Sequence, residues 1–219
     1  MFQFCSLYSG SSGNCSLVQT ENTKILIDVG QSSKKIAEAL SSMDIDPYSI
    51  NGILITHEHS DHVKGLGVFS KKYNVPVYAN LETWNAMTNQ KEKVASENVK
   101  LFSFNKFSIG DIDIRPFAIP HDAANPCGFN VYHKDKKLSL ATDIGHINKS
   151  IMDCLMSSNF LLLEANYEPE VLRCSKYPYM LKSRISGPNR TPFKCRCRKN
   201  NFIPYKLWVK QCYVRAPKS

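Results

Sequence analysis

Chemically reactive side chains crowd into one short stretch, residues 54–65, with the sequence LITHEHSDHVKG. It contains His57, His59, Asp61 and His62, so three of the chain's six histidines lie within six positions. Residues i and i+2 of an extended segment share a face, which lets His57 and His59 bind one cation together. Asp61 and His62 follow after a bend and point to a second position nearby. Because imidazole with carboxylate suits zinc, manganese or iron, the stretch predicts a metal site of unspecified metal.

Further ligands must come from other parts of the chain, and two residues have suitable settings. His121 follows the apolar segment 114–120, and Asp143 ends the strand-like segment 137–143. Carboxyl ends of strands place side chains at the rim of a sheet, although either residue alone is equally compatible with an ordinary polar loop. Asp28, at the end of KILIDVG, is either a further site residue or a structural acceptor that hydrogen-bonds the metal loop.

Short apolar segments of two kinds surround these residues. Strands are expected at 2–8, 14–20, 24–30, 52–56, 75–79, 99–104, 111–119, 128–134, 137–143 and 159–166. Apolar residues at helical spacing predict helices at 32–43, 63–73, 81–95 and 146–156. Strands that alternate first with helices and then with one another are typical of mixed sheets covered by helices, which predicts an α/β fold.

Length and composition limit the class of protein. The 219 residues suit one large domain or two small ones, with enough apolar content for a core. No apolar run reaches about 18 residues, so no transmembrane helix is expected. The opening MFQFCSLYSG lacks the basic segment of a secretory signal. The eight cysteines are therefore expected to be free thiols of a cytoplasmic protein.

The net charge of +9 is divided unevenly along the chain. Residues 1–170 hold 15 Lys and Arg against 19 Asp and Glu, a balance of −4. Residues 171–219 hold the other 13 Lys and Arg and no acid, a balance of +13. Such asymmetry often marks a basic interaction tail. The body of the chain gives no charge-based argument for binding a phosphate backbone.

The order of these motifs resembles that of the metallo-β-lactamase fold superfamily. The matching features are Asp28, THEHSDH at 56–62, His121 within IPHD and Asp143 within ATDIG, and the resemblance covers roughly residues 1–185. The segments SLYSGSSGNCSLV and LLLEANYEPEVL are similar to the YycJ/WalJ-like subgroup. The resemblance implies a four-layer αββα sandwich with a two-metal site at one edge of its sheets.

The resemblance also implies a role for each candidate residue. His57, His59 and His121 would hold the first metal, Asp61 and His62 the second, Asp143 would bridge both, and Asp28 would support the loop. The cofactors implied are two divalent ions, zinc or manganese, with Asp61 and Asp143 as the catalytic carboxylates.

A hydroxide held between two such cations suits phosphodiester hydrolysis, and the subgroup implies an exonuclease acting on DNA. Two alternatives stay open. One is a small-molecule hydrolase of the same fold, acting on a thioester or a lactam. The other is an inactive metal-binding or nucleic-acid-binding remnant. It predicts salt-sensitive DNA binding that survives His57→Ala.

The carboxyl-terminal part departs from the family pattern. The family has a further histidine in a G-H-L-S-N motif, whereas this chain has none after His146, which leaves the second metal one ligand short. Codons for residues 190–199 can be chosen so that, read from the second base of the first, they encode G-H-L-S-N-A-D-A-G. We interpret this as a frame shift near Arg190. Residues 1–185 would then be an incomplete metallo-β-lactamase-like domain, and 186–219 a basic tail without a clear fold.

Overall fold

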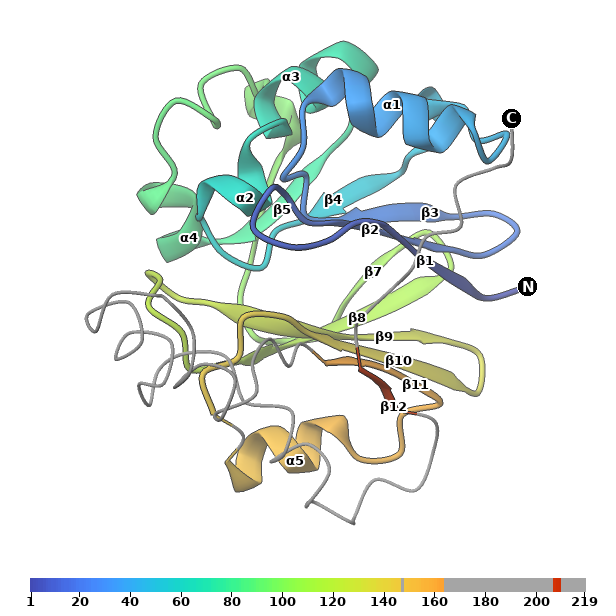
Figure 1. The fold of residues 1–219 in the computed structure, drawn as a ribbon, viewed down its shortest axis with the longest axis vertical. Helices are drawn as coiled ribbons and strands as arrows, with labels where there is room; N and C mark the ends of the chain where they lie inside the picture. Colours follow the sequence, from blue (N-terminus) through green and yellow to red (C-terminus); the bar gives the residue numbers. More distant parts are fainter. Residues whose placement is uncertain (147, 164–206, 210–219) are drawn as a thin grey trace, which may run out of the picture.

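Two six-stranded sheets lie face to face at the centre of the molecule (Figure 1). The structure is a computed structural model and describes residues 1–146, 148–163 and 207–209. The first sheet has the order β1 (Gln3–Tyr8), β2 (Cys15–Gln19), β3 (Lys24–Ile27), β4 (Gly52–Leu54), β5 (Val77–Asn80) and β6 (Val99–Phe102). The second has the order β12 (Leu207–Val209), β11 (Phe160–Leu163), β10 (Lys136–Ala141), β9 (Cys127–His133), β8 (Ile112–Ala118) and β7 (Phe107–Ile109).

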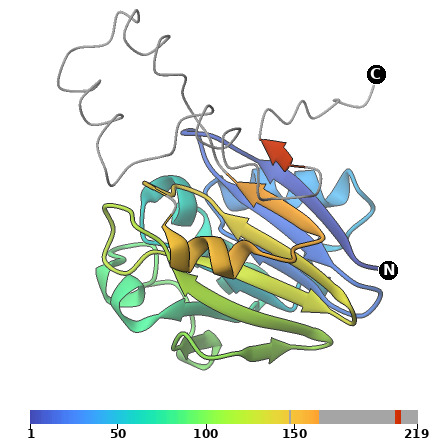
Figure 2. The same ribbon diagram turned by 90° about the horizontal axis from the view of Figure 1, so that it is seen from below.

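Helices cover the outer face of each sheet. The first sheet is covered by α1 (Ser33–Ser41), α2 (Ser60–Val63), α3 (Leu66–Tyr73) and α4 (Leu81–Ala86). The second is covered by α5 (Lys149–Leu155), which lies across it in Figure 2. None of the helices in the described residues is long and apolar enough to cross a membrane. The expected αββα sandwich is thus confirmed over the described part of the chain.

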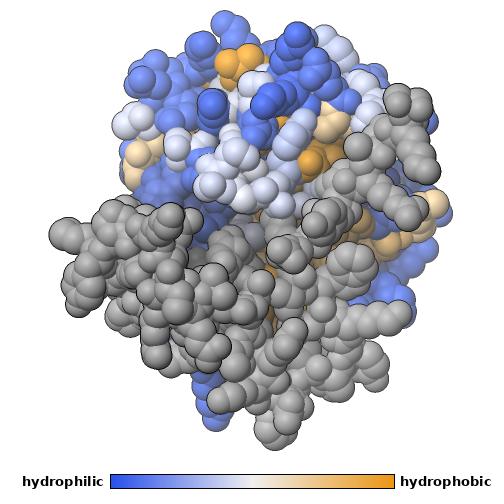
Figure 3. Space-filling model, viewed as in Figure 1, coloured by the Kyte–Doolittle hydropathy of each residue, from blue (hydrophilic) through white to orange (hydrophobic). Residues whose placement is uncertain are grey.

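Each pair of adjacent layers encloses its own apolar core. Leu26 packs with Ile36 and Leu40 of α1, whereas its neighbours Ile25 and Ile27 pack between the two sheets. Strand β3 therefore has a continuous apolar sequence because both of its faces are buried. Each such side chain contributes about 1.5–3 kcal/mol relative to an exposed one. The outward side of α1 carries charged residues instead, and this face is hydrophilic in Figure 3.

The strand directions bring the candidate ligands to matching edges of the two sheets. Strands β3 and β4 are parallel, so their carboxyl ends lie side by side. Strands β8 and β10 both run antiparallel to β9, so their carboxyl ends also point the same way. Asp28, the segment 55–62, His121 and Asp143 follow these four strands.

The helix expected at 81–95 was wrong beyond Ala86. The extended backbone at Met87 ends α4, and this side chain is 2 % exposed in the first core. The ammonium group of Lys91 then donates to the backbone oxygens of Trp84 and Asn85 at 2.9 and 3.0 Å. These contacts satisfy carbonyl groups that the ended helix leaves open. The spacing of apolar residues did not reveal that the chain turns back after Met87 and places Lys91 against the end of α4.

Two further boundaries differ from expectation. The helix expected at 63–73 is divided into α2 and α3 at Gly65, where a Cβ atom would lie 2.1 Å from the backbone oxygen of Gln31. Strand β7 was not expected at all. The boundary expected at 185–186 and the frame shift proposed near Arg190 lie outside the described residues and stay predictions. From the expected tail, the structure describes β12, which pairs in parallel with β11.

Three backbone segments cross in close contact at Gly30. The N–H of Gly30 donates to the oxygen of Asn14 at 2.8 Å, and the N–H of Asn14 donates to the oxygen of Asp61 at 2.7 Å. Next to them, Val29 donates to the oxygen of His62 at 2.7 Å. A Cβ atom on Gly30 would lie 1.7 Å from the oxygen of Asp61 and 2.5 Å from the nitrogen of Asn14. This crossing holds the histidine-rich loop in place and leaves no room for a side chain.

We expect Gly30→Ala to lower the free energy of unfolding by at least about 1–3 kcal/mol, because backbone atoms must move to admit the methyl group. Urea unfolding followed by circular dichroism measures this loss. Gly10→Ala is the control for a glycine without a close contact, since a Cβ atom there meets nothing within 4 Å. The positive φ of 111° at Gly10 adds a strain that Gly30 does not share, so a larger loss in Gly30→Ala is due to the close contact. Equal stability of the two variants would contradict the close contact at Gly30.

Candidate metal centre

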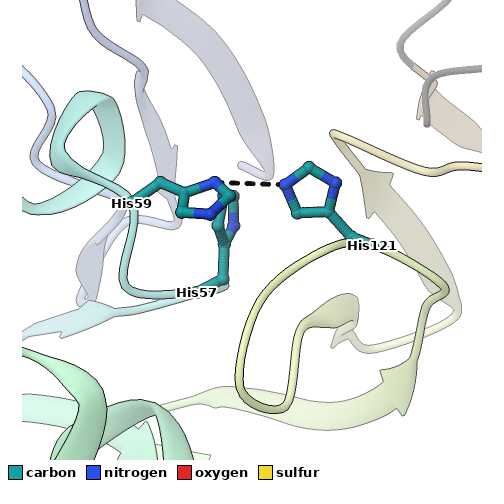
Figure 4. A group of neighbouring side chains, drawn as sticks. All are labelled: His57, His59 and His121. Carbon is teal, nitrogen blue, oxygen red and sulfur yellow. Dashed lines mark hydrogen bonds between the residues drawn. The ribbon is translucent and has the colours of Figure 1, made fainter. Parts of the chain in front are cut away.

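Three imidazole rings converge between the two sheets. His57 and His59 come from the loop after β4, and His121 from the loop after β8 (Figure 4). One ring nitrogen from each lies within 4.8 Å of the others. Nδ1 of His59 is 3.2 Å from Nε2 of His121, and the three rings are steeply inclined to one another. We call these residues the first ligand group.

A second ligand group consists of His57, His62 and Asp143, whose ligand atoms also lie within 4.8 Å of one another. Nε2 of His62 is 3.0 Å from Oδ2 of Asp143. Asp61 lies beside this group and outside it, with Oδ2 3.7 Å from Nε2 of His62 and its side chain 33 % exposed. The residue shared by the two groups is thus His57, whereas the resemblance assigned the bridging position to Asp143.

The unsatisfied atoms of these groups fit a bound cation. His57 is completely buried, and within the described part of the chain its Nε2 has no hydrogen-bond partner. Buried ring nitrogens are rarely left so in native proteins, since an unmet hydrogen bond costs about 1–3 kcal/mol. A divalent cation bound by neighbouring imidazoles would supply the missing partner. The residues present therefore fit a divalent metal.

Asp28 organises both groups without belonging to either. Its carboxylate is buried and accepts from the backbone N–H and the hydroxyl of Thr56, each at 2.9 Å. It also lies 2.8 Å from Nδ1 of His62. The Thr56 hydroxyl is in turn 2.9 Å from Nδ1 of His57. Because the carboxylate only accepts, this network places a proton on Nδ1 of each ring and directs both Nε2 atoms toward a cation.

The protonation of the second group follows from burial and from neighbouring charges. Burial, with the positive charge of His62 second, holds the pKa of His57 well below its usual range, so this ring is neutral. Burial also acts to lower the pKa of His62, but the carboxylates of Asp28 and Asp143 outweigh it and raise the pKa well above the usual value. Burial opposes ionisation of Asp143, yet hydrogen bonding and charge from His62 lower its pKa. A proton on His62 thus competes with a cation for Nε2.

The loop that carries His121 is tied to the first sheet by an interloop clasp of Glu58, Asn80 and Asn125. The Glu58 carboxylate accepts from the backbone N–H of Ala124 at 2.8 Å. The Asn80 amide donates to the backbone oxygen of Asn125 at 2.8 Å, and the Asn125 amide donates to a carboxylate oxygen of Glu82 at 3.1 Å. The clasp therefore sets the separation between the two halves of the first ligand group.

Sequence reasoning missed several residues that contact the ligands. Thr56 and Glu58 lie inside the histidine-rich stretch, so their position between ligands was a usable signal. Asn14 gave no such signal, because it was expected only as the first residue of the strand at 14–20. Its amide nitrogen lies 3.1 Å from Nε2 of His62.

Comparison with known proteins agrees with this geometry. Residues 8–171 match the family described as the Metallo-beta-lactamase superfamily. The protein named Exodeoxyribonuclease YycJ from Bacillus anthracis is 38 % identical over 183 residues, which cover 83 % of this chain and 69 % of that protein. The protein named Exodeoxyribonuclease WalJ from Streptococcus pneumoniae serotype 2 is 41 % identical over 187 residues, which cover 84 % of this chain and 70 % of that protein.

A solved structure shows the same fold at low identity. The metallo-beta-lactamase fold protein YhfI from Bacillus subtilis superposes with a TM-score of 0.62 at 14 % identity, over 76 % of this chain and 72 % of that one. Because fold, ligand groups and sequence match all agree, the chain belongs to the metallo-beta-lactamase superfamily, and it is an enzyme of the metal-dependent hydrolase type.

Proposed function

We propose that the chain is a cytoplasmic exonuclease that hydrolyses phosphodiester bonds of DNA with two divalent cations. The observation that carries the proposal is the pair of adjacent ligand groups that share His57. The names of the YycJ and WalJ relatives, at 38 % and 41 % identity, support DNA as the substrate. The buried thiols of Cys15 and Cys127 are free, which suits a reducing compartment.

The two groups differ in the cation that they favour. Three imidazole nitrogens in the first group suit zinc, whereas imidazole with carboxylate in the second suits zinc or manganese. When bound, such cations supply Lewis acidity and a nucleophilic water at neutral pH. Asp61 and His62 are the proposed ligands of the second cation, together with Asp143.

The residues of the chain contribute orientation and proton transfer. Asp28 and Thr56 hold the rings of His57 and His62 in the tautomers that present Nε2. The half-buried Asp143 carboxylate stays ionised because His62 lies against it. Asp61 is one third exposed beside His62, so its carboxylate faces both the second ligand group and the solvent, to which the proton released by phosphodiester hydrolysis passes.

The first test is hydrolysis of end-labelled DNA in the presence of zinc or manganese, compared with a thioester and a lactam reporter. We expect release of nucleotides from DNA, inhibition by a chelator and a loss of at least about 100-fold in His57→Ala, since Nε2 of His57 is a ligand atom at the junction of the two groups. His133→Ala is the control, because His133 contacts Asp111 and belongs to neither group. Hydrolysis of the thioester or lactam alone would contradict the proposed substrate. Binding of DNA without hydrolysis would favour an inactive remnant.

Replacement of Asp28 tests the supporting network. In Asp28→Asn the amide NH2 would face either Nδ1–H of His62 or the backbone N–H of Thr56, so one contact that holds the ligand rings in place is lost in either orientation. We expect the affinity for cations to fall about 10–100-fold, as measured by isothermal titration calorimetry. Asp44→Asn is the matched control, because Asp44 shares the positive φ, 59° against 62°, but is exposed. An unchanged affinity in Asp28→Asn would show that the network does not orient the ligands.

Cation binding should also depend on pH with a definite sign. The carboxylates of Asp28 and Asp143 raise the pKa of His62 well above its usual range, so its Nε2 holds a proton that must leave before a cation binds. We therefore expect affinity to increase as pH rises through neutrality, with net release of protons. Calorimetry in buffers of different ionisation enthalpy measures the number released. Affinity that falls with rising pH would contradict the assignment.

A further inference from the structure

Asn14 is held firmly beside the second ligand group. It ends the loop of residues 9–14 that joins β1 to β2, and it is 9 % exposed. Its backbone N–H donates to the oxygen of Asp61 at 2.7 Å, and its backbone oxygen accepts from Gly30 at 2.8 Å. These two backbone hydrogen bonds therefore fix the position of Asn14 next to the backbone of the candidate ligand Asp61.

The orientation of the Asn14 amide is determined by Gly10. Oδ1 accepts from the backbone N–H of Gly10 at 3.1 Å, and Nδ2 donates to the backbone oxygen of Gly10 at 3.3 Å. A flipped amide would place two donors together and two acceptors together, so only the observed orientation satisfies both groups. One N–H of Nδ2 bonds Gly10, and the other is directed toward the ligand group.

Two ligand atoms lie within reach of that second N–H. Nδ2 lies 3.1 Å from Nε2 of His62 and 3.4 Å from Oδ2 of Asp61. A cation bound to His62 would occupy the lone pair of Nε2, which leaves Oδ2 of Asp61 as the remaining acceptor of this pair. Since Asp61 lies outside the second group and is partly exposed, its carboxylate needs such a partner to hold one orientation.

We propose that Asn14 is a positioning residue that orients the Asp61 carboxylate for the second cation. The inference rests on the proposed second cation and deepens it, because it assigns a residue of the loop 9–14 to that subsite. Asn14 binds no cation itself, since an amide N–H has no lone pair to offer. It couples the conformation of this loop to the Asp61 ligand.

The test measures cation binding and does not depend on hydrolysis. Manganese is titrated into the full chain and followed by calorimetry and by electron paramagnetic resonance, with circular dichroism to show that each variant folds. We expect Asn14→Ala to weaken the second binding event about 10–100-fold and to leave the first unchanged. Asn14→Ser, whose side chain is too short to reach Asp61, replaces it if the alanine variant does not fold.

Two comparisons separate positioning from general loop stability. Gln31→Ala removes another anchor of the same loop, the 2.6 Å bond from Nε2 of Gln31 to the oxygen of Ser12, and should leave the second event unchanged. In an Asp61→Ala background, Asn14→Ala should have no further effect. An equal loss in Gln31→Ala, or an independent loss in the Asp61→Ala background, would overturn the inference.

The inference and the proposed function fail in distinguishable ways. If the parent chain binds two cations but does not hydrolyse DNA, and Asn14→Ala loses the second binding event, the proposed function is rejected and the inference is kept. Hydrolysis of DNA with normal cation binding in Asn14→Ala would keep the function and reject the inference. A parent chain that binds one cation would reject both the second subsite and the role of Asn14.

Discussion

The site depends on the contact of Asp28 with the ring of His62 and, through the hydroxyl of Thr56, on its link to the ring of His57. Burial of a carboxylate without hydrogen-bond partners costs free energy. The Asp28 carboxylate has three partner groups, which are the backbone N–H and the hydroxyl of Thr56 and Nδ1 of His62. The same contacts select the tautomers of one ring in each ligand group. The carboxylate of Asp28, which directly follows β3, therefore orients one ligand ring for each of the two cation positions. The backbone at Asp28 is left-handed, with a φ of 62°.

The site also depends on the union of two sheets that are distant in sequence. The loop after β4 supplies His57 and His59 and the adjoining helix α2 supplies His62, while His121 and Asp143 follow strands of the second sheet. Neither sheet contains a complete ligand group, so the site forms only after the sandwich has closed. The interloop clasp then fixes the approach of the two halves through neutral and charge-assisted hydrogen bonds.

Much of the fold could be predicted from the sequence because strand and helix periodicities were clear and the order of motifs resembled one superfamily. The ligand candidates His57, His59, His62, His121 and Asp143 could be found because each follows an apolar strand, and the structure brings them together. Asn14 could not be found in this way. Its contact with His62 joins residues 48 positions apart and depends on the backbone crossing at Gly30, which has no periodic signature. The end of α4 at Ala86 was missed for a similar reason, since Lys91 closes it from outside the helix.

The residues of the first ligand group are divided between the two sheets, so a bound cation would also stabilise the fold. A cation held by His57 and His59 on one side and by His121 on the other acts as a cross-link between the layers. Because it binds the folded chain and not the unfolded one, it adds about 2.7 kcal/mol of stability at a concentration one hundred times its dissociation constant. The supply of metal in the cell would then regulate how long the protein survives as well as how fast it works.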